Sequence, residues 1–174
     1  SMLKRSRLVG TMFLLLSLSI VGVSAYVYEQ AQQTVTQTIK EIATLTLQNS
    51  ALGNIEEGET RNYTKNELSS LGNAISIATT KASVYLYLDS DLDSLASSYE
   101  TFDVVVKYAT VPAGSSRSSG ETACTLSLTS PDYSSISLDA AGVWSFDYEI
   151  TTTAKRVSSD VSGTVTITVS AENA

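Results

Sequence analysis

The chain has 174 residues and a formal net charge of −7, which is enough length for one domain beside a terminal segment. Histidine is absent and Cys124 is the only cysteine, so the sequence excludes an intramolecular disulfide, an ordinary zinc site and Ser-His-Asp catalysis. Residues 1–50 carry four basic and two acidic groups (net +2), whereas residues 51–174 carry seven basic and sixteen acidic groups (net −9). Because the acidic part offers no basic face for phosphates, we expect no nucleic-acid partner, and no motif predicts an enzyme.

An apolar stretch without charge or proline, Leu8 to Tyr28, follows a basic start at Lys4, Arg5 and Arg7. A helix of that length spans roughly 30 Å, the thickness of the hydrocarbon core of a bilayer. Three roles fit such a segment. It can be a secretory signal peptide, with Val23-Ser24-Ala25 as the small residues before the cut, a permanent membrane anchor, or a helix that leaves the membrane to pack in the core of a filament.

We expect this helix to be retained and to be the main polymerising element. Parallel copies at the centre of a filament would bury its apolar surface and leave the acidic part in solvent. The side chains expected to pack there are Leu8, Phe13, Leu14, Leu15, Leu16, Leu18, Ile20, Val21, Val23 and Val27.

The segment after the apolar stretch is amphipathic. Tyr28, Val35, Ile39 and Ile42 recur at spacings of seven, four and three, which places them on one helical face and extends the predicted helix to residue 43. The many Thr residues in between lower helix propensity, and a long extended strand is the alternative.

Residues 44–174 predict strands and turns. Apolar and polar residues alternate in seven or eight short runs, and turn signals such as Leu52-Gly53-Asn54 separate them. A glycine- and serine-rich loop is expected at 113–121. The predicted fold class is an α+β architecture: a basic segment (1–7), a long N-terminal apolar then amphipathic α-helix (8–43), and an all-β, immunoglobulin-like antiparallel sandwich head (44–174). The alternating runs are 44–49, 75–78, 82–90, 102–111, 123–130, 134–138, 143–151 and 163–171.

One set of carboxylates has the spacing of a calcium loop. Asp89, Asp91 and Asp93 alternate and Glu100 lies eleven residues after the first of them, as in an EF-hand. Ser94 stands where that loop requires glycine, and the flanks do not predict two helices. An acidic solvated turn is the alternative, because Asp and Ser also populate turns for local reasons. Apart from this possible Ca²⁺, no cofactor is expected.

Asn62-Tyr63-Thr64 is the one Asn-X-Ser/Thr tripeptide in the sequence. On a secreted protein it would make Asn62 a glycan acceptor and the chain a glycoprotein. A chance tripeptide is the alternative.

The arrangement resembles archaeal type IV pilins and archaellins. The residues that carry the resemblance are KRSR at 4–7, followed by LVGTMFLLLSLSIVG, with a Ser- and Thr-rich head after them. The resemblance implies a structural subunit of a helical cell-surface filament, with adhesion among the possible roles. It also implies a homopolymer that is membrane-inserted before assembly and extracellular afterwards.

A second resemblance is to archaeal threads and bundling pili, which are similar to bacterial TasA fibres. It implies export through a cleaved signal, residues 1–25, and donation of residues 26–50 as a strand to the sandwich of the next subunit. A single-pass anchored domain that binds a partner at the cell surface is the non-filament alternative.

Overall fold

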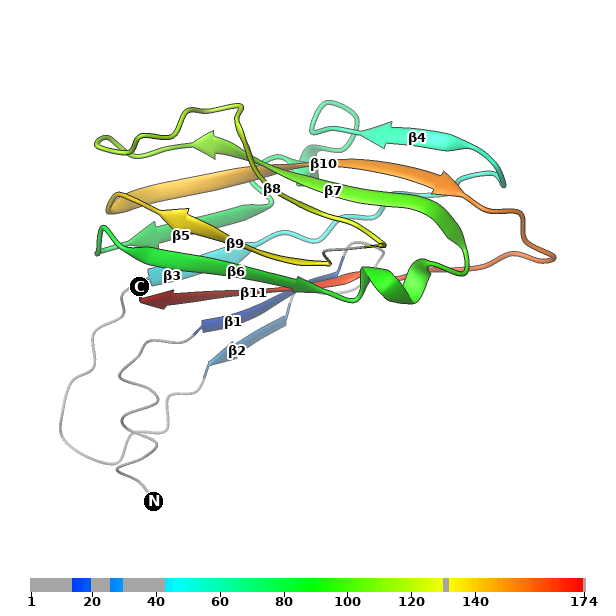
Figure 1. Cartoon of the computed structure of the whole chain (residues 1–174), viewed down its shortest axis with the longest axis horizontal. Coiled ribbons are helices and arrows are strands. Elements are labelled where there is room, and N and C mark those ends of the chain that lie inside the picture. Colours follow the sequence, from blue (N-terminus) through cyan, green and yellow to red (C-terminus); the bar gives the residue numbers. More distant parts are fainter. Residues whose placement is uncertain (1–13, 20–25, 30–42, 130–131, 174) are drawn as a thin grey trace, which may run out of the picture.

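The structure is a computed structural model that describes residues 14–19, 26–29, 43–129 and 132–173. It is built from two antiparallel sheets packed face to face (Figure 1). Sheet A has the strand order β2-β1-β11-β6-β9, and sheet B has the order β3-β5-β10-β7-β8, with β4 paired to β10 beside it. The bounds of the elements are β1 Leu14–Ser19, β2 Tyr26–Glu29, β3 Ala43–Leu47, β4 Thr60–Tyr63, η1 Ser69–Leu71, β5 Ile75–Thr79, β6 Val84–Ser90, η2 Leu92–Leu95, β7 Tyr99–Thr110, β8 Thr122–Leu126, β9 Tyr133–Leu138, β10 Gly142–Ala154 and β11 Thr166–Asn173.

Alternating sequence patterns explain the two layers. In a strand, successive side chains point to opposite faces, so each run buries every second residue between the sheets. In β10 this buried set includes Trp144, Phe146 and Tyr148, none more than 1% exposed. Trp144 and Phe146 stack with ring centroids 6.5 Å apart, and the Trp144 indole N–H donates to the carbonyl of Ala140 at 3.0 Å. These rings form the centre of the core.

The longest strand, β10, organises sheet B. One of its edges pairs with β7 along nearly its whole length, from Ser145 to Ala154. Its other edge is shared by β5, opposite residues 142–146, and β4, opposite residues 150–153. The start of β10 requires glycine: Gly142 has φ +132°, and a Cβ there would lie 2.7 Å from the Cβ of Pro112.

The long N-terminal helix predicted for residues 8–43 is wrong. The described part of that range is strand: Leu14, Leu15, Leu16 and Leu18 lie in β1, and Val27 lies in β2. The other residues expected on the polymerising helix, Leu8, Phe13, Ile20, Val21 and Val23, lie outside the described residues. Within the described residues the helices are η1 and η2, and none is long and apolar enough to cross a membrane. The fold is therefore not α+β.

The physical reason for this correction is the outer edge of β11. A helix satisfies its own backbone groups and cannot pair with that edge, whereas an extended apolar segment satisfies both backbones at once. The run LLLSLS also alternates in its second half, which is compatible with a strand. The conformation of Leu14–Ser19 is thus decided by the strand with which it pairs, and a local sequence pattern does not reveal that strand.

Candidate functional site

The candidate site begins at the outer edge of β11, the edge that faces away from β6. The inner face of β11 belongs to the core, since Ile167, Val169 and Ala171 are at most 1% exposed. One edge of the strand pairs with β6 from Ile167 to Asn173. The other pairs with β1 in six register pairs, from Leu14 opposite Ala171 to Ser19 opposite Thr166.

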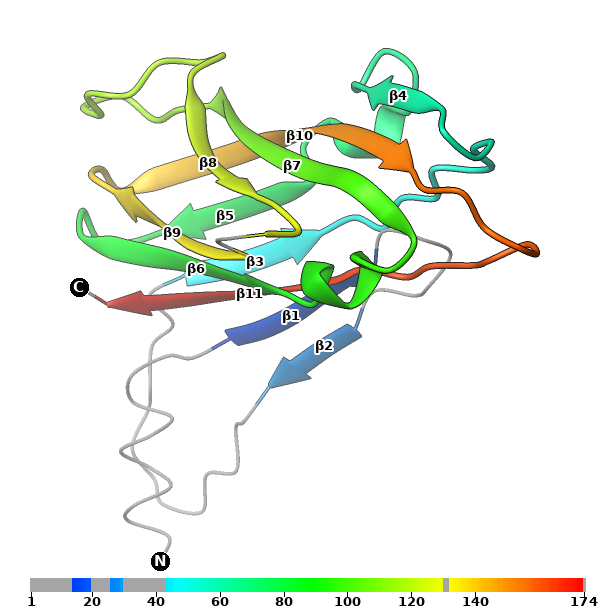
Figure 2. The same cartoon turned by 45° about the vertical axis from the view of Figure 1, so that its right-hand side comes forward.

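This edge lies on one of the two long sides of the sandwich. On the opposite side β8 of sheet B contacts β9 of sheet A, and both strands come from the body of the chain. On the candidate side, β1 lies next to β11 and contacts β3, so it bridges the two sheets (Figure 2). We call this space between β11 and β3 the slot. The slot is filled by β1, which is well separated in the sequence from the strands of the sandwich body.

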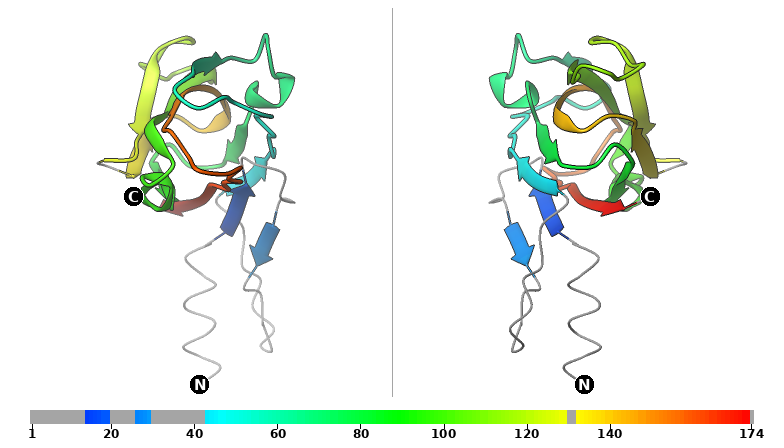
Figure 3. Two further views of the ribbon diagram at one scale, coloured as in Figure 1. Left: turned by 90° about the vertical axis from the view of Figure 1, so that its right-hand side faces the viewer. Right: turned by 90° about the vertical axis from the view of Figure 1, so that its left-hand side faces the viewer.

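Figure 3 shows how β1 and β2 project from the two-layer body beyond β11. β2 pairs only with β1 among the described strands, with Tyr28 opposite Leu15 and Val27 opposite Leu16. The next described element, β3, starts at Ala43 and pairs with β5 of the same sandwich. Residues 43–47, which belong to the donor strand 26–50 expected for a fibre, thus pair within this sandwich, and strand donation stays a prediction.

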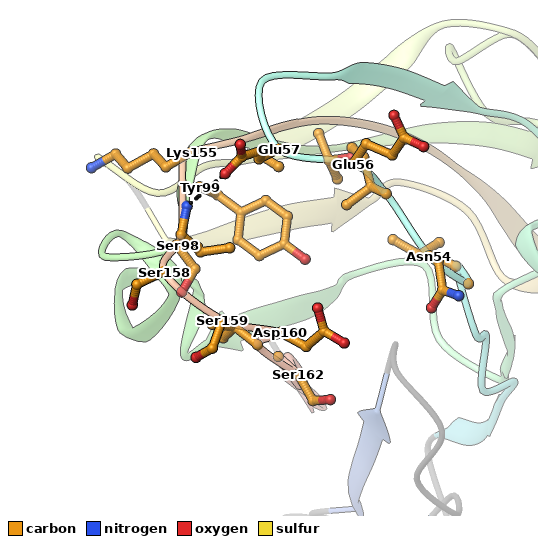
Figure 4. Close-up of a pocket in the computed structure, with 18 of the residues that line it drawn as sticks. Asn54, Glu56, Glu57, Ser98, Tyr99, Lys155, Ser158, Ser159, Asp160 and Ser162 are labelled. Carbon is orange, nitrogen blue, oxygen red and sulfur yellow. Dashed lines mark hydrogen bonds between the residues drawn. The ribbon is translucent and has the colours of Figure 1, made fainter.

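A pocket of about 790 Å³ lies at the end of the slot (Figure 4). Residues 52–57, which follow β3 by a few positions, form one wall, and residues 157–163, which precede β11, form another. The two walls are joined where the Glu57 carboxylate accepts the backbone N–H of Val157 at 3.1 Å. The wall formed by residues 52–57 thus continues from β3, and the wall formed by residues 157–163 leads into β11.

The lining of the pocket is acidic with an aromatic ring at its centre. Its charged members are Glu56, Glu57, Asp160 and Lys155. The Lys155 ammonium donates to the carbonyl of Ala96 at 2.7 Å and points away from the pocket in Figure 4. The ammonium therefore does not neutralise the carboxylates of the lining.

Tyr99 extends into the same space, with its hydroxyl on the side of the Asp160 carboxylate (Figure 4). The ring packs edge-on against Phe102 with centroids 5.2 Å apart. Partial burial, and secondarily the neighbouring Tyr63, raise the pKa of the Tyr99 hydroxyl, so it is neutral at physiological pH. Two apolar side chains on the wall, Val157 and Val161, are 39% and 57% exposed.

The carboxylates with calcium-loop spacing lie in different elements. Asp89 is in β6, Asp91 precedes η2, Asp93 is in η2 and Glu100 is in β7. Within the described residues no three His, Cys, Asp or Glu side chains come together in a way that could hold a metal ion. Asp91 has a structural contact instead: its carboxylate accepts the backbone N–H of Thr166, the first residue of β11, at 2.7 Å.

Asn62 lies in β4, and its side chain is exposed at the surface. Its amide oxygen accepts a hydrogen bond from the hydroxyl of Thr151 at 2.8 Å, directly across the ladder. The hydroxyl of Thr64 donates to Glu67. Accessibility is thus compatible with a glycan, and the proposal of a modified Asn62 stays a prediction.

Cys124 is buried in β8, on the side of the sandwich where β8 contacts β9. Burial raises the pKa of its thiol to about 11, against a smaller opposing contribution from a hydrogen bond with Ser134. The thiol is therefore protonated at physiological pH and has the character of a small core residue.

The sequence reasoning missed the pocket. Its walls are loops, and no motif marks residues that become neighbours only when β3 and β11 are placed in the sandwich. Two local signals were available, the turn signal Leu52-Gly53-Asn54 and the mostly polar run at 158–163. No protein-family model and no curated protein sequence matches this chain.

Proposed function

We propose that the chain is a structural subunit of an extracellular cell-surface fibre, in which each subunit donates a strand to the next. The slot beside β11 is where the donated strand binds. The observation that carries the proposal is that β11, a strand with fully buried core residues, has its outer edge paired with β1, whereas the first strand of the body, β3, starts only at Ala43.

An unfilled slot has a strong tendency to bind another strand. Without a partner, the outer edge of β11 exposes a row of N–H and C=O groups next to the inner-face residues Ile167 and Val169. Adding an extended segment to such an edge supplies backbone hydrogen bonds, and alternate side chains supply specificity. A slot that also exposes core residues gains apolar burial when it is filled.

The donor in this proposal is the segment 26–42, which we call the donor arm. Residues 1–25 have the pattern of an export signal, and a cut after Ala25 would remove β1 and vacate the slot. The donor arm of another subunit then takes the place of β1. The arm ends where its own sandwich begins, because Ala43 is already paired with Thr79 in β5.

One arm and one slot on different parts of each subunit make a head-to-tail joint. Such a heterologous contact does not close on itself unless the rotation between subunits happens to close a ring, so it propagates as an open polymer. The acidic body remains at the surface of the fibre, where like charge keeps neighbouring fibres soluble. A structural subunit of this kind needs no catalytic residues, which agrees with a sequence that has no recognisable catalytic motif.

The test uses two variants of the full chain, expressed where export and assembly can occur. Val35→Asp places a charge on the parity of the arm that carries Val35 and Ile39, the residues expected to enter the slot. Thr36→Asp places the same charge on the other parity, which faces solvent. We expect Val35→Asp to abolish fibres in electron micrographs and Thr36→Asp to leave them. Fibres of normal length from the Val35→Asp chain would contradict strand donation.

A further inference from the structure

Both halves of the proposed joint are occupied within the uncut chain. The slot is filled by β1, which pairs with β11 from Thr166 to Ala171. The other edge of β1 pairs with β2, Tyr26–Glu29, which is the start of the donor arm. Among the described strands β2 has no partner except β1. A chain in this state therefore offers other subunits neither an open slot nor a free start of the arm.

The register shows that β1 fits the slot in sequence as well as in backbone. Three leucines of β1 stand opposite the three core residues of β11, with Leu14 opposite Ala171, Leu16 opposite Val169 and Leu18 opposite Ile167. Ser17 and Ser19 stand opposite Thr168 and Thr166, which have the other parity in β11. The order of apolar and polar residues in β1 thus matches the order in β11. An export signal needs only an apolar run, so this match is an additional property of the segment.

The expected export cut falls between these two strands. Residues 20–25 connect β1 to β2 in the sequence, and a cut after Ala25 comes directly before Tyr26, the first residue of β2. We propose that β1 is an intramolecular plug, which holds the subunit monomeric until the cut releases it. This inference rests on the proposed fibre function and adds to it the regulation of the slot.

The covalent link gives the plug its advantage over a donor arm. A strand that is linked to its own binding site has an effective concentration in the millimolar range, far above that of arms from other subunits in dilute solution. After the cut, β1 is a separate short peptide and this advantage is lost. When β1 leaves, β2 loses its partner as well, because a two-stranded hairpin is at best marginally stable alone. One cut therefore opens the slot and frees the arm.

The experiment uses the full chain with the site of a specific protease in place of residues 20–25. Assembly before and after cutting is measured as the concentration of subunit that stays unassembled after sedimentation. We expect the cut to lower this concentration about a hundredfold.

Two variants of the uncut chain test the plug without any cut. Leu16→Asp places a charge at a core position of the register, and Ser17→Asp places the same charge at the neighbouring outer position. We expect Leu16→Asp to expel β1 and to assemble uncut, and Ser17→Asp to stay monomeric. Near-ultraviolet circular dichroism of the buried Trp144 checks that each variant keeps its sandwich.

A disulfide tests whether the plug and the donor arm compete for the same slot. Residues 17 and 168 are opposite each other in the ladder, so Ser17→Cys with Thr168→Cys brings two thiols to a separation that a disulfide spans. In the cut chain, we expect the oxidised form to stay unassembled and reduction to start assembly.

The outcomes separate the two proposals. Assembly that starts on cutting and that the disulfide blocks supports both. Equal assembly of cut and uncut chains, with a disulfide that still blocks it, overturns the plug and leaves the fibre function standing. A folded, uncut Leu16→Asp chain that stays monomeric does the same. Fibres that form with the disulfide intact, or no fibres from the cut and reduced chain, overturn both.

Discussion

Asp139 shows how a single carboxylate orders a loop that composition alone describes as flexible. Its oxygens accept hydrogen bonds from the hydroxyl of Ser115 and from both the backbone N–H and the hydroxyl of Ser116, the latter two at 2.9 and 2.7 Å. These bonds stabilise the charged form and hold the pKa of Asp139 at about 2, below its ordinary 3.8. The loop at 113–121 is thus tied to the start of the turn before β10.

The first prediction concerns pH. Because the pKa of Asp139 is lowered in the folded state, its contribution to the stability of the fold is fully present above pH 3.8. That contribution is lost as the pH falls through about 2. An NMR titration of the Asp139 carboxyl should therefore have its midpoint near pH 2, with the Ser116 amide shifting in parallel. In a chain with Ser115→Ala and Ser116→Ala the midpoint should move back toward 3.8. An ordinary midpoint in the unchanged chain would contradict the contact.

Residue-level reasoning from the sequence was most limited where side chains meet across the fold. The alternate spacing of Asp89, Asp91 and Asp93 was visible, but their placement in β6, before η2 and within η2 depends on where β6 ends. The hydrogen bond from Thr166 to Asp91 joins residues that only the pairing of β11 with β6 brings together. A one-dimensional spacing cannot distinguish a ligand from such a contact.

At the scale of elements, alternation predicted the strands of the body well, because one face of each strand is buried in the core. Val104 and Val106 in β7, or Ile167 and Val169 in β11, follow the expected parity. The same reasoning failed for Leu14 to Ser19. A continuous apolar run carries no parity along most of its length, so its conformation depends on the partner it finds, here the outer edge of β11.

The second prediction tests a turn that the sandwich depends on. Gly142→Ala should lower the free energy of unfolding by about 3 kcal/mol, because the backbone is strained for an L-residue and the new Cβ meets Pro112. Gly53→Ala is the matched control: it also has a positive φ, +76°, but nothing lies within 4 Å of its added Cβ. We expect it to cost about 1 kcal/mol. Equal losses in chemical denaturation would show that the Pro112 contact carries no weight.

At the scale of the whole molecule, the two long sides of the sandwich are not equivalent. The side at β8 and β9 is closed by two strands of the body, whereas the side at β11 and β3 is closed by β1. The sequence led to the hypothesis of a polymer, with strand donation as one route, but it could not locate the slot. That β1 is the strand beside the outer edge of β11 follows only from the complete strand order.

The central claim is that the donor arm of one subunit fills the slot of the next, and a reconstruction of the native fibre by electron cryomicroscopy tests it most directly. The account predicts a subunit that begins at Tyr26, with residues of the 26–42 segment antiparallel to β11 of the neighbouring subunit and continuous with β3 of their own. A fibre in which β11 pairs with Leu14–Ser19 of the same subunit, or in which its outer edge has no strand beside it, would contradict the account.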